Sequence, residues 1–240
     1  MQINLPTSEA FTSNEEGPYT ADPRDDGNWS SGKAGVGTLI GSDRGCGAPA
    51  TIAYVLKNKL GIIVTAAWMK ALPDAIYQGM FVSGYWDLIN ADALPSGLDV
   101  SGMDYAWNRG PGTSAHTLQR ALGVTQDGQI GPQTLAAIAD PPIATMLGRT
   151  DRATLKIAQA AFGLPPEQCD GVAGPVTAKI AASNDTNVLI SVIAAFSSQQ
   201  MIDYRGLYNW STYGAGWTAR TGRRLATAIN LATAPAKAAA

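Results

Sequence analysis

Two similar stretches organise this sequence, QRALGVTQDGQIGPQT at residues 119–134 and QAAFGLPPEQCDGVAGPVT at residues 159–177. In the same order, both contain a Gln, an Ala, a Gly, an Asp-Gly pair, a Gly-Pro pair and a Thr. Gly commonly ends a helix, Asp-Gly forms a tight turn, and Pro is favoured in the first turn of a new helix. The pattern therefore predicts two copies of one helix–turn–helix unit, in which the glycines and prolines shape the backbone.

Helical patterns also dominate the rest of the chain. From Asp104 onward the periodicity is almost entirely helical. Four earlier helices are expected over residues 1–16, 50–60, 66–72 and 73–89. Thr65 is expected to cap the third of them. Residues 17–49 are rich in Gly, Asp, Asn, Ser and Pro, which predicts a loop with a small β-hairpin near residues 33–42, and Val36–Ile40 is its best strand candidate.

Composition excludes several classes of function. The chain has 240 residues, with 17 Lys and Arg against 19 Asp and Glu, so its net charge is only −2. This balance argues against a nucleic-acid partner and against a polybasic membrane-surface protein. The longest apolar runs, Leu60–Met69 and Val188–Phe196, cover about half of a membrane span. We therefore expect a globular monomer with no nucleic-acid partner and no membrane insertion.

Cysteine and histidine are too scarce for the common metal and nucleophile sites. Two cysteines, Cys46 and Cys169, and one histidine, His116, cannot form a Cys-rich zinc site or a His-based metallopeptidase centre. A serine hydrolase would depend on His116, yet the chain has no Gly-x-Ser-x-Gly motif. Acidic side chains alone could still hold a hard cation, but no EF-hand spacing is present. No metal and no cofactor are therefore implied. No pattern pairs the two cysteines, so a disulfide between them is left open.

Four further motifs follow one another along the chain: Glu16-Gly17-Pro18-Tyr19, Asp25-Asp26-Gly27-Asn28-Trp29-Ser30, Asp104-Tyr105-Ala106-Trp107-Asn108-Arg109-Gly110-Pro111 and Gly216-Trp217-Thr218-Ala219-Arg220. Together they resemble glycoside hydrolase family 108, which comprises muramidases typical of phage endolysins and related lytic proteins. The stretch 119–134 resembles a peptidoglycan-binding repeat. The chain departs from the family in three places. Pro18 replaces a Gly, Ser30 replaces a Thr, and Asp43-Arg44-Gly45-Cys46 stands where Lys-Tyr-Gly-Ile is usual, so this last stretch is interpreted as a remodelled substrate wall.

The resemblance implies a fold class and a domain plan. The fold is expected to be mainly α, a lysozyme-like α+β arrangement with the small hairpin near the active site and helical peptidoglycan-binding repeats. Residues 1–100 would form the catalytic segment and residues 101–182 the region with the two repeats. Residues 183–231 would be C-terminal helices that pack on the catalytic region, followed by a frayed tail at residues 232–240.

The same resemblance implies a set of site residues. Hydrolysis of a glycosidic bond needs a proton donor for the leaving oxygen and a second polar group near the anomeric carbon. Glu16 is expected to be the general acid, with Asp25 and the Ser30 hydroxyl beside the reacting bond. Asp25 is also explained by an Asx turn, since Asp-Asp-Gly is turn chemistry. The predicted substrate-binding residues are Tyr19, Asp104, Trp107 and Asn108.

The implied substrate is bacterial peptidoglycan, cut at the β-1,4 linkage between N-acetylmuramic acid and N-acetylglucosamine. Two alternatives are kept: a cell-wall-binding protein without catalysis, and a cysteine peptidase of the peptide stems that uses Cys46 and His116. The first 16 residues contain no basic segment followed by an apolar one, so no signal peptide is expected. The expected location is the host cytoplasm until release by a holin, and then the periplasm and cell wall.

Overall fold

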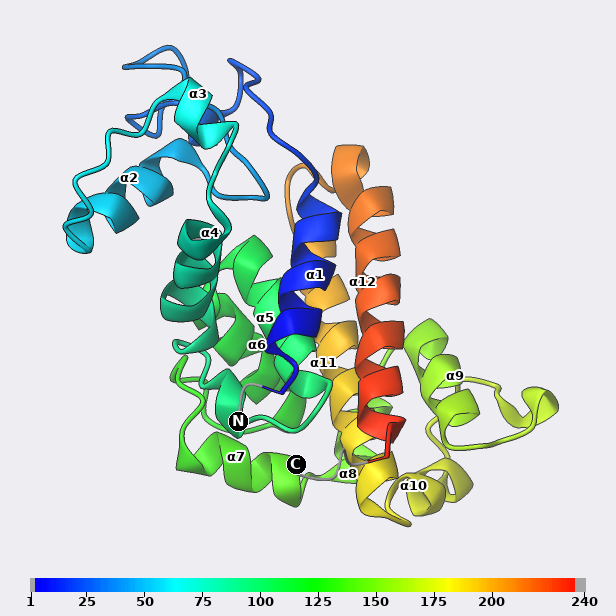
Figure 1. Cartoon of the computed structure of the whole chain (residues 1–240). Coiled ribbons are helices and arrows are strands. Elements are labelled where there is room, and N and C mark those ends of the chain that lie inside the picture. Colours follow the sequence, from blue (N-terminus) through cyan, green and yellow to red (C-terminus); the bar gives the residue numbers. More distant parts are fainter. Residues whose placement is uncertain (1–2, 236–240) are drawn as a thin grey trace. The chain divides into compact units, whose positions relative to one another are not determined.

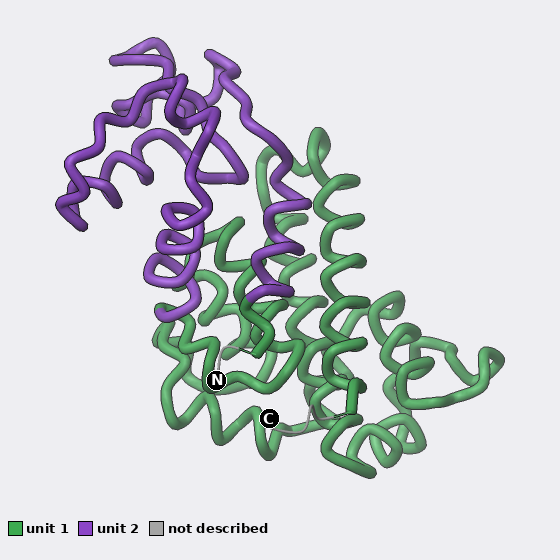
Figure 2. The backbone as a smooth tube through the Cα atoms, in the orientation of Figure 1, with its two compact units in different colours: residues 1–5, 88–240 green, residues 6–87 purple. Residues whose placement is uncertain are grey.

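The computed structural model describes residues 3–235. The chain divides into two compact units (Figure 2): a smaller unit of residues 6–87, and a larger unit of residues 88–235 together with residues 3–5. The boundary that the sequence predicted at residue 100 falls inside a helix of the larger unit, Leu98–Arg109. Of the tail expected to fray, residues 232–233 continue the last helix, and residues 236–240 lie outside the described residues.

The smaller unit consists of short helices and a long loop (Figure 1). Its helical elements are α1 (Leu5–Glu16), the 3₁₀ turn η1 (Asp26–Asn28), α2 (Ala48–Lys57), α3 (Ala66–Met69), α4 (Asp74–Phe81) and the π-helical turn η2 (Val82–Trp86). The Thr65 hydroxyl accepts a hydrogen bond from the Trp68 amide, so the predicted cap of α3 is confirmed. The single helix expected over residues 73–89 is interrupted by the π turn, in which the Asp87 amide donates to the Val82 carbonyl at 3.0 Å.

The predicted β-hairpin and the predicted strand Val36–Ile40 are wrong. Residues 3–235 contain no β-strand, and the loop has only isolated bridges, among them Thr20 with Ser42 and Trp29 with Leu39. A strand needs several consecutive residues in extended conformation. Gly37, at φ +80°, and Gly41, at φ +90°, interrupt the extended backbone in this segment. The fold is therefore helical throughout, and the hairpin is replaced by a loop that is cross-linked at single positions.

The larger unit is a bundle built around one long helix. Its elements are η3 (Ala91–Ala93), α5 (Leu98–Arg109), α6 (Pro111–Leu122), α7 (Pro132–Ala139), α8 (Ile143–Gly148), α9 (Arg152–Ala161), η4 (Pro166–Gln168), α10 (Pro175–Ala181), α11 (Asp185–Arg205) and α12 (Trp210–Thr233). Helix α11 is buried on all sides over most of its length and packs against α5, α6, α8, α9, α10 and α12. The C-terminal helices thus pack with the repeats in one unit.

Within residues 3–235, no single helix combines the length and the hydropathy of a membrane span. Helices α10 and α11, bent by 116° relative to each other, reach the length and composition of a membrane span only when they are counted together.

A buried glutamine organises each repeat. The Gln119 side chain donates to Asp127 at 2.6 Å and to Thr134 at 3.1 Å, and it accepts a hydrogen bond from the Gly128 amide at 3.0 Å. In the second copy, Gln159 makes the equivalent bonds to Asp170 (2.9 Å), Thr177 (3.2 Å) and the Gly171 amide (2.7 Å). Both glutamines are 1% exposed. The predicted repeat is confirmed, and the shared residues are those that hold each turn together.

A buried charge cluster joins two of the sequence motifs within the larger unit. Asp104 on α5 is fully buried and binds Arg220 at 2.5 Å and Arg224 at 2.6 Å, both on α12. Arg224 also donates to Gln200 on α11. Burial opposes the charge of Asp104, but the neighbouring Arg224 and Arg220 guanidiniums lower its pKa. The cluster therefore holds α5, α11 and α12 together.

Candidate active site

The Glu16 side chain lies at the end of a helix and at the wall of a cavity. Helix α1 ends at Glu16, where the Gly17 amide closes the last turn on the Ser13 carbonyl at 3.2 Å. The helix breaks directly after the carboxylate, as the Glu-Gly-Pro sequence predicts. The cavity has a volume of about 290 Å³ and is lined by Glu16, Pro18, Thr20, Asp25, Gly27, Ser42, Arg44, Gly45 and Gly47. All of these residues belong to the smaller unit.

Asp25 lines the same cavity. One of its carboxylate oxygens accepts a hydrogen bond from the Gly27 amide at 2.9 Å, so the residue also forms the Asx turn that opens η1. The two interpretations of Asp25 from sequence are thus compatible, because one oxygen orients the side chain while the carboxylate borders the cavity. The structure brings Glu16 and Asp25, nine positions apart in the sequence, to one cavity.

Ser30 occupies a different place in the loop. Its hydroxyl accepts a hydrogen bond from the Thr38 amide at 3.0 Å, and its own amide donates to the Thr38 carbonyl at 2.9 Å. Ser30 is not one of the residues that line the cavity. Its geometry accounts for a role in holding residues 30–38, and its catalytic role stays a prediction.

Thr20 and Ser42 line the cavity and were missed by the sequence reasoning. Each donates its amide to the carbonyl of the other, at 2.9 and 2.8 Å, so the two segments are paired at this single position. No motif in the sequence indicates this pairing, because it joins residues 22 positions apart in an irregular loop. Two hydroxyl-bearing residues are therefore available at the cavity wall in place of Ser30.

Tyr19 braces the loop. Its hydroxyl donates to the Ile40 carbonyl at 3.0 Å, and its ring lies against Gly41, where an added Cβ would be only 2.5 Å from the ring. Tyr19 is half-buried and is not among the residues of the cavity wall. Its predicted contact with substrate stays a prediction.

The other three predicted substrate-binding residues belong to the larger unit. Asp104 is fully buried with both carboxylate oxygens bound to arginines, so it has no surface that a sugar can reach, and we assign it to helix packing. Asn108 donates to the Asp104 carbonyl, one turn earlier in α5, at 3.1 Å. Trp107 is half-buried. The binding roles of Asn108 and Trp107 stay predictions.

Arg44 provides a fixed positive charge at the cavity wall. Its guanidinium donates to Asp43 at 2.9 Å, to Asp74 at 2.8 Å and to the Leu72 carbonyl at 2.7 Å, and it lies 4.5 Å from the centre of the Tyr77 ring. Burial works against the charge, but the two aspartates raise the pKa of Arg44 overall. The departure from the family at Asp43–Cys46 was the sequence signal for this part of the wall.

The cysteine-peptidase alternative is contradicted by the structure. Cys46 is 2% exposed, and burial raises the pKa of its thiol to about 12. A nucleophilic cysteine needs a lowered pKa and access to substrate. His116 lies in the larger unit, where a Cβ at Gly128 would meet its imidazole at 2.9 Å. Cys46 and Cys169 are both free thiols, so the disulfide left open from sequence is not formed.

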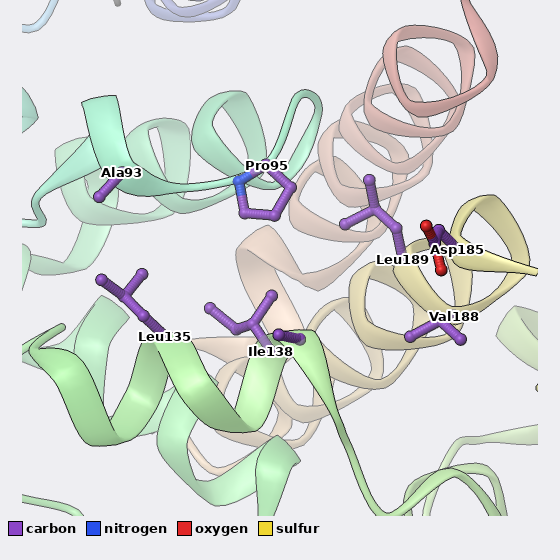
Figure 3. Close-up of a pocket in the computed structure, with 8 residues that line it drawn as sticks. Ala93, Pro95, Leu135, Ile138, Asp185, Val188 and Leu189 are labelled. Carbon is purple, nitrogen blue, oxygen red and sulfur yellow. The ribbon is translucent and has the colours of Figure 1, made fainter.

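A second cavity lies in the larger unit (Figure 3) and lacks the groups needed for this chemistry. It has a volume of about 460 Å³ and is lined by Ala93, Pro95, Leu135, Ile138, Ala139, Asp185, Val188 and Leu189. Asp185 is the one ionisable residue in this lining, so no pair of acid and base is present. Across residues 3–235 there is also no group of three His, Cys, Asp or Glu side chains placed to hold a metal ion.

Residues 10–110 match the family model described as Glycosyl hydrolase 108. The chain carries a glycosyl hydrolase 108 domain. The match includes Glu16, Asp25 and the whole cavity wall, and it confirms the prediction that the protein is a glycoside hydrolase.

Among solved structures, the chain is similar to one described as "Structure of Brucella abortus SagA", with 22% sequence identity and a TM-score of 0.63. The similarity covers 99% of this chain and 100% of that chain, and at this level of identity it shows a shared fold. A comparison with curated proteins finds no match.

Proposed function

We propose that this glycoside hydrolase cleaves bacterial peptidoglycan at the β-1,4 bond between N-acetylmuramic acid and N-acetylglucosamine. The observation that carries the proposal is that Glu16 and Asp25 line one cavity inside the matched domain. Two carboxyl groups beside one bond are what most glycoside hydrolases use. The resemblance of the motifs around both residues to muramidases supports peptidoglycan as the substrate.

In this proposal Glu16 is the general acid. As the bond to the leaving oxygen breaks, the Glu16 carboxyl transfers its proton to that oxygen, and positive charge develops on the sugar ring. Asp25, oriented by the Gly27 amide, supplies the negative charge that stabilises the ring. Water then adds its hydroxyl group to the anomeric carbon as the new reducing end, and its remaining proton restores the Glu16 carboxyl. One glycosidic bond and one water molecule are consumed per cut.

Product analysis tests the assignment of the bond. Purified sacculi are digested, reduced with borohydride and analysed by mass spectrometry. A muramidase produces reduced N-acetylmuramic acid at the new ends. Reduced N-acetylglucosamine ends would indicate a glucosaminidase, and free amino groups without new reducing sugars would indicate an amidase or peptidase. Either of these results would contradict the proposal even if the protein were strongly lytic.

We also propose a role as an endolysin, made in the host cytoplasm and released to the wall by a holin. The resemblance to phage-type muramidases supports it. Expression in a bacterial host with and without a co-expressed holin provides the test. Lysis that needs both proteins is the expected result, whereas lysis by this chain alone or by neither combination would contradict the role.

Wall binding by the region with the repeats is a second candidate function, favoured by the duplicated turns centred on Gln119 and Gln159. These repeats share a core with α11, so a fragment of residues 101–182 would lose the helix on which they pack. The suitable fragment spans residues 88–240. Sedimentation of this fragment with sacculi is expected. A folded fragment that remains in the supernatant would show that the repeats serve only the architecture of the larger unit.

A further inference from the structure

The start of α12 and the loop before it form a long uncharged segment. Residues 206–219, GLYNWSTYGAGWTA, contain no Asp, Glu, Lys or Arg. Four of these residues are aromatic: Tyr208, Trp210, Tyr213 and Trp217. The others are small, apolar or bear hydroxyl or amide groups. We call the four aromatic residues the aromatic ridge.

Three members of the aromatic ridge lie on one face of α12. Residues 210, 213 and 217 are spaced by three and four positions, which places them one above another on a helix. The ring centres of Trp210 and Trp217 are 6.3 Å apart, and those of Tyr213 and Trp217 are 5.8 Å apart. The interplanar angles are 39° and 37°, so the rings are tilted modestly from one another. Tyr208 is 98% exposed and Tyr213 is 55% exposed.

Packing beneath the ridge holds two of its rings in place. Trp217 stacks on the buried Tyr204 of α11, with ring centres 5.1 Å apart and an angle of 21°. Tyr204 in turn meets Tyr105 edge to face at 5.6 Å. Trp210 lies so close to Gly214 that an added Cβ would be 2.6 Å from its ring. A ring that is already fixed in this way loses little conformational entropy when a ligand binds.

The chemistry of the segment selects among ligands. The segment itself has no basic residue to pair with the phosphates of a nucleic acid or of anionic lipids, and Arg205 directly before it is the nearest positive charge in the preceding sequence. The ridge combines two packed tryptophan rings with two exposed tyrosine rings, beside hydroxyl and amide groups. This combination suits a ligand with flat apolar faces edged by hydroxyls, which is the description of a sugar ring. We propose that the aromatic ridge is a glycan-binding platform. Given the proposed function, its ligand is the sugar backbone of a peptidoglycan strand.

The test measures binding separately from cleavage. Full-length protein carrying Glu16→Gln is titrated with glycan strands from which the peptide stems have been removed, and tryptophan fluorescence reports binding. The double variant Tyr208→Ala/Tyr213→Ala is expected to bind roughly tenfold more weakly, because truncation of exposed anchoring aromatics removes much of the contact energy. The matched variant Tyr208→Phe/Tyr213→Phe keeps both rings and is expected to retain most of the affinity. Leu88→Ala, at a 61% exposed position of the same unit and outside the two repeats, serves as a control.

Several results would contradict the proposal that the aromatic ridge binds glycans. Unchanged binding by the double alanine variant would do so, and so would equal losses in the phenylalanine and alanine variants, since these point away from stacking. If sedimentation velocity showed that the ridge variants abolish self-association without changing strand affinity, the ridge would be a contact between copies of the chain. Tyr213→Ala alone keeps the proposal testable if the double variant unfolds, because this ring is 55% exposed and lies 5.8 Å from Trp217 within the ridge. If the protein bound glycan strands but released no muramidase products, the glycan-binding role of the ridge would be supported and the proposed muramidase activity would be rejected.

Discussion

The loop that builds the cavity and the two repeats use different means to define an irregular backbone. Residues 17–47 are held by isolated backbone pairs, such as Thr20 with Ser42, and by glycines in conformations that other residues avoid. Each repeat turn is held by one buried glutamine that bonds three groups at once. The loop leaves carboxylates at a cavity wall, whereas the repeats use their polar groups internally. The comparison supports placing the proposed chemistry in the loop, and it gives the two repeat glutamines an architectural role.

The largest expected effect concerns the general acid. Glu16→Gln is expected to reduce peptidoglycan hydrolysis by about 10³-fold, because the amide keeps the shape of the side chain but cannot donate the required proton. The thermal midpoint should remain close to that of the wild type. Turbidity loss of sacculi and circular dichroism provide the two measurements. Glu15→Gln is the matched control and should keep its activity; the opposite pattern would move the acid to the neighbouring residue.

The buried charge cluster should give the largest effect on stability. Asp104→Asn is expected to lower the free energy of unfolding by about 3–5 kcal/mol, because Arg220 and Arg224 would then be buried without their counter-charge. Denaturant unfolding measures the change, with the exposed Asp140→Asn as the control. A loss of activity with unchanged stability would instead indicate that Asp104 contacts substrate.

The same cluster predicts a dependence on pH. The folded-state pKa of Asp104 is lowered, so its contribution to stability is present above the unfolded pKa of about 3.9 and is lost as the pH falls through the folded-state value. Wild-type protein should therefore lose its stability advantage over Asp104→Asn below about pH 4. If the difference in free energy of unfolding between the two proteins stayed constant across this pH range, the interpretation would be contradicted.

Substitution of a single glycine is expected to disrupt the loop of residues 17–47. Gly41→Ala is expected to destabilise the protein by about 2–4 kcal/mol and to reduce activity, because the backbone is left-handed and the new Cβ would meet the Thr20 carbonyl at 2.6 Å as well as the Tyr19 ring. Gly35→Ala is the control. It shares a positive φ but has open space around the added Cβ, so a cost of about 1 kcal/mol is expected. Equal costs at the two positions would show that contact with Tyr19 and Thr20 is unimportant.

The repeats should respond differently from the loop. Gln159→Ala is expected to lower the free energy of unfolding by about 1–3 kcal/mol, because Asp170, Thr177 and the Gly171 amide lose their common partner. Activity per folded molecule should be unchanged. Gln133→Ala, at an exposed position, is the control. Reduced hydrolysis by fully folded Gln159→Ala protein would place the repeats in the catalytic machinery and erase the distinction between the two regions.

The smallest effect is expected at the two cysteines. In native protein at pH 8, iodoacetamide should modify Cys169 and spare Cys46, because Cys46 is buried and its pKa is raised to about 12. Mass spectrometry of tryptic peptides measures both positions in one sample, and unfolding with guanidinium should make both reactive. Rapid modification of Cys46 in the native protein, accompanied by loss of lysis, would revive the cysteine-peptidase alternative.

Local features of this protein were readable from the sequence. The Thr65 cap, the end of α1 at Glu16 and the two repeat turns all depend on hydrogen bonds or steric preferences among residues close in the chain. The family resemblance added the enzyme class. Because such interactions act over a few residues, their spacing in the sequence is sufficient to predict them.

Only the tertiary structure decided the features that join distant residues. The motif around Asp104 predicts a contact with substrate, but its arginine partner Arg220 lies 116 residues further along the chain. The anchoring of Arg44 by Asp74 spans 30 residues. The missing strand at Val36–Ile40 shows the same limit, since pairing depends on which segment packs alongside and whether both backbones stay extended. Long-range packing determines these partners, and the local spacing of residues along the chain does not predict them.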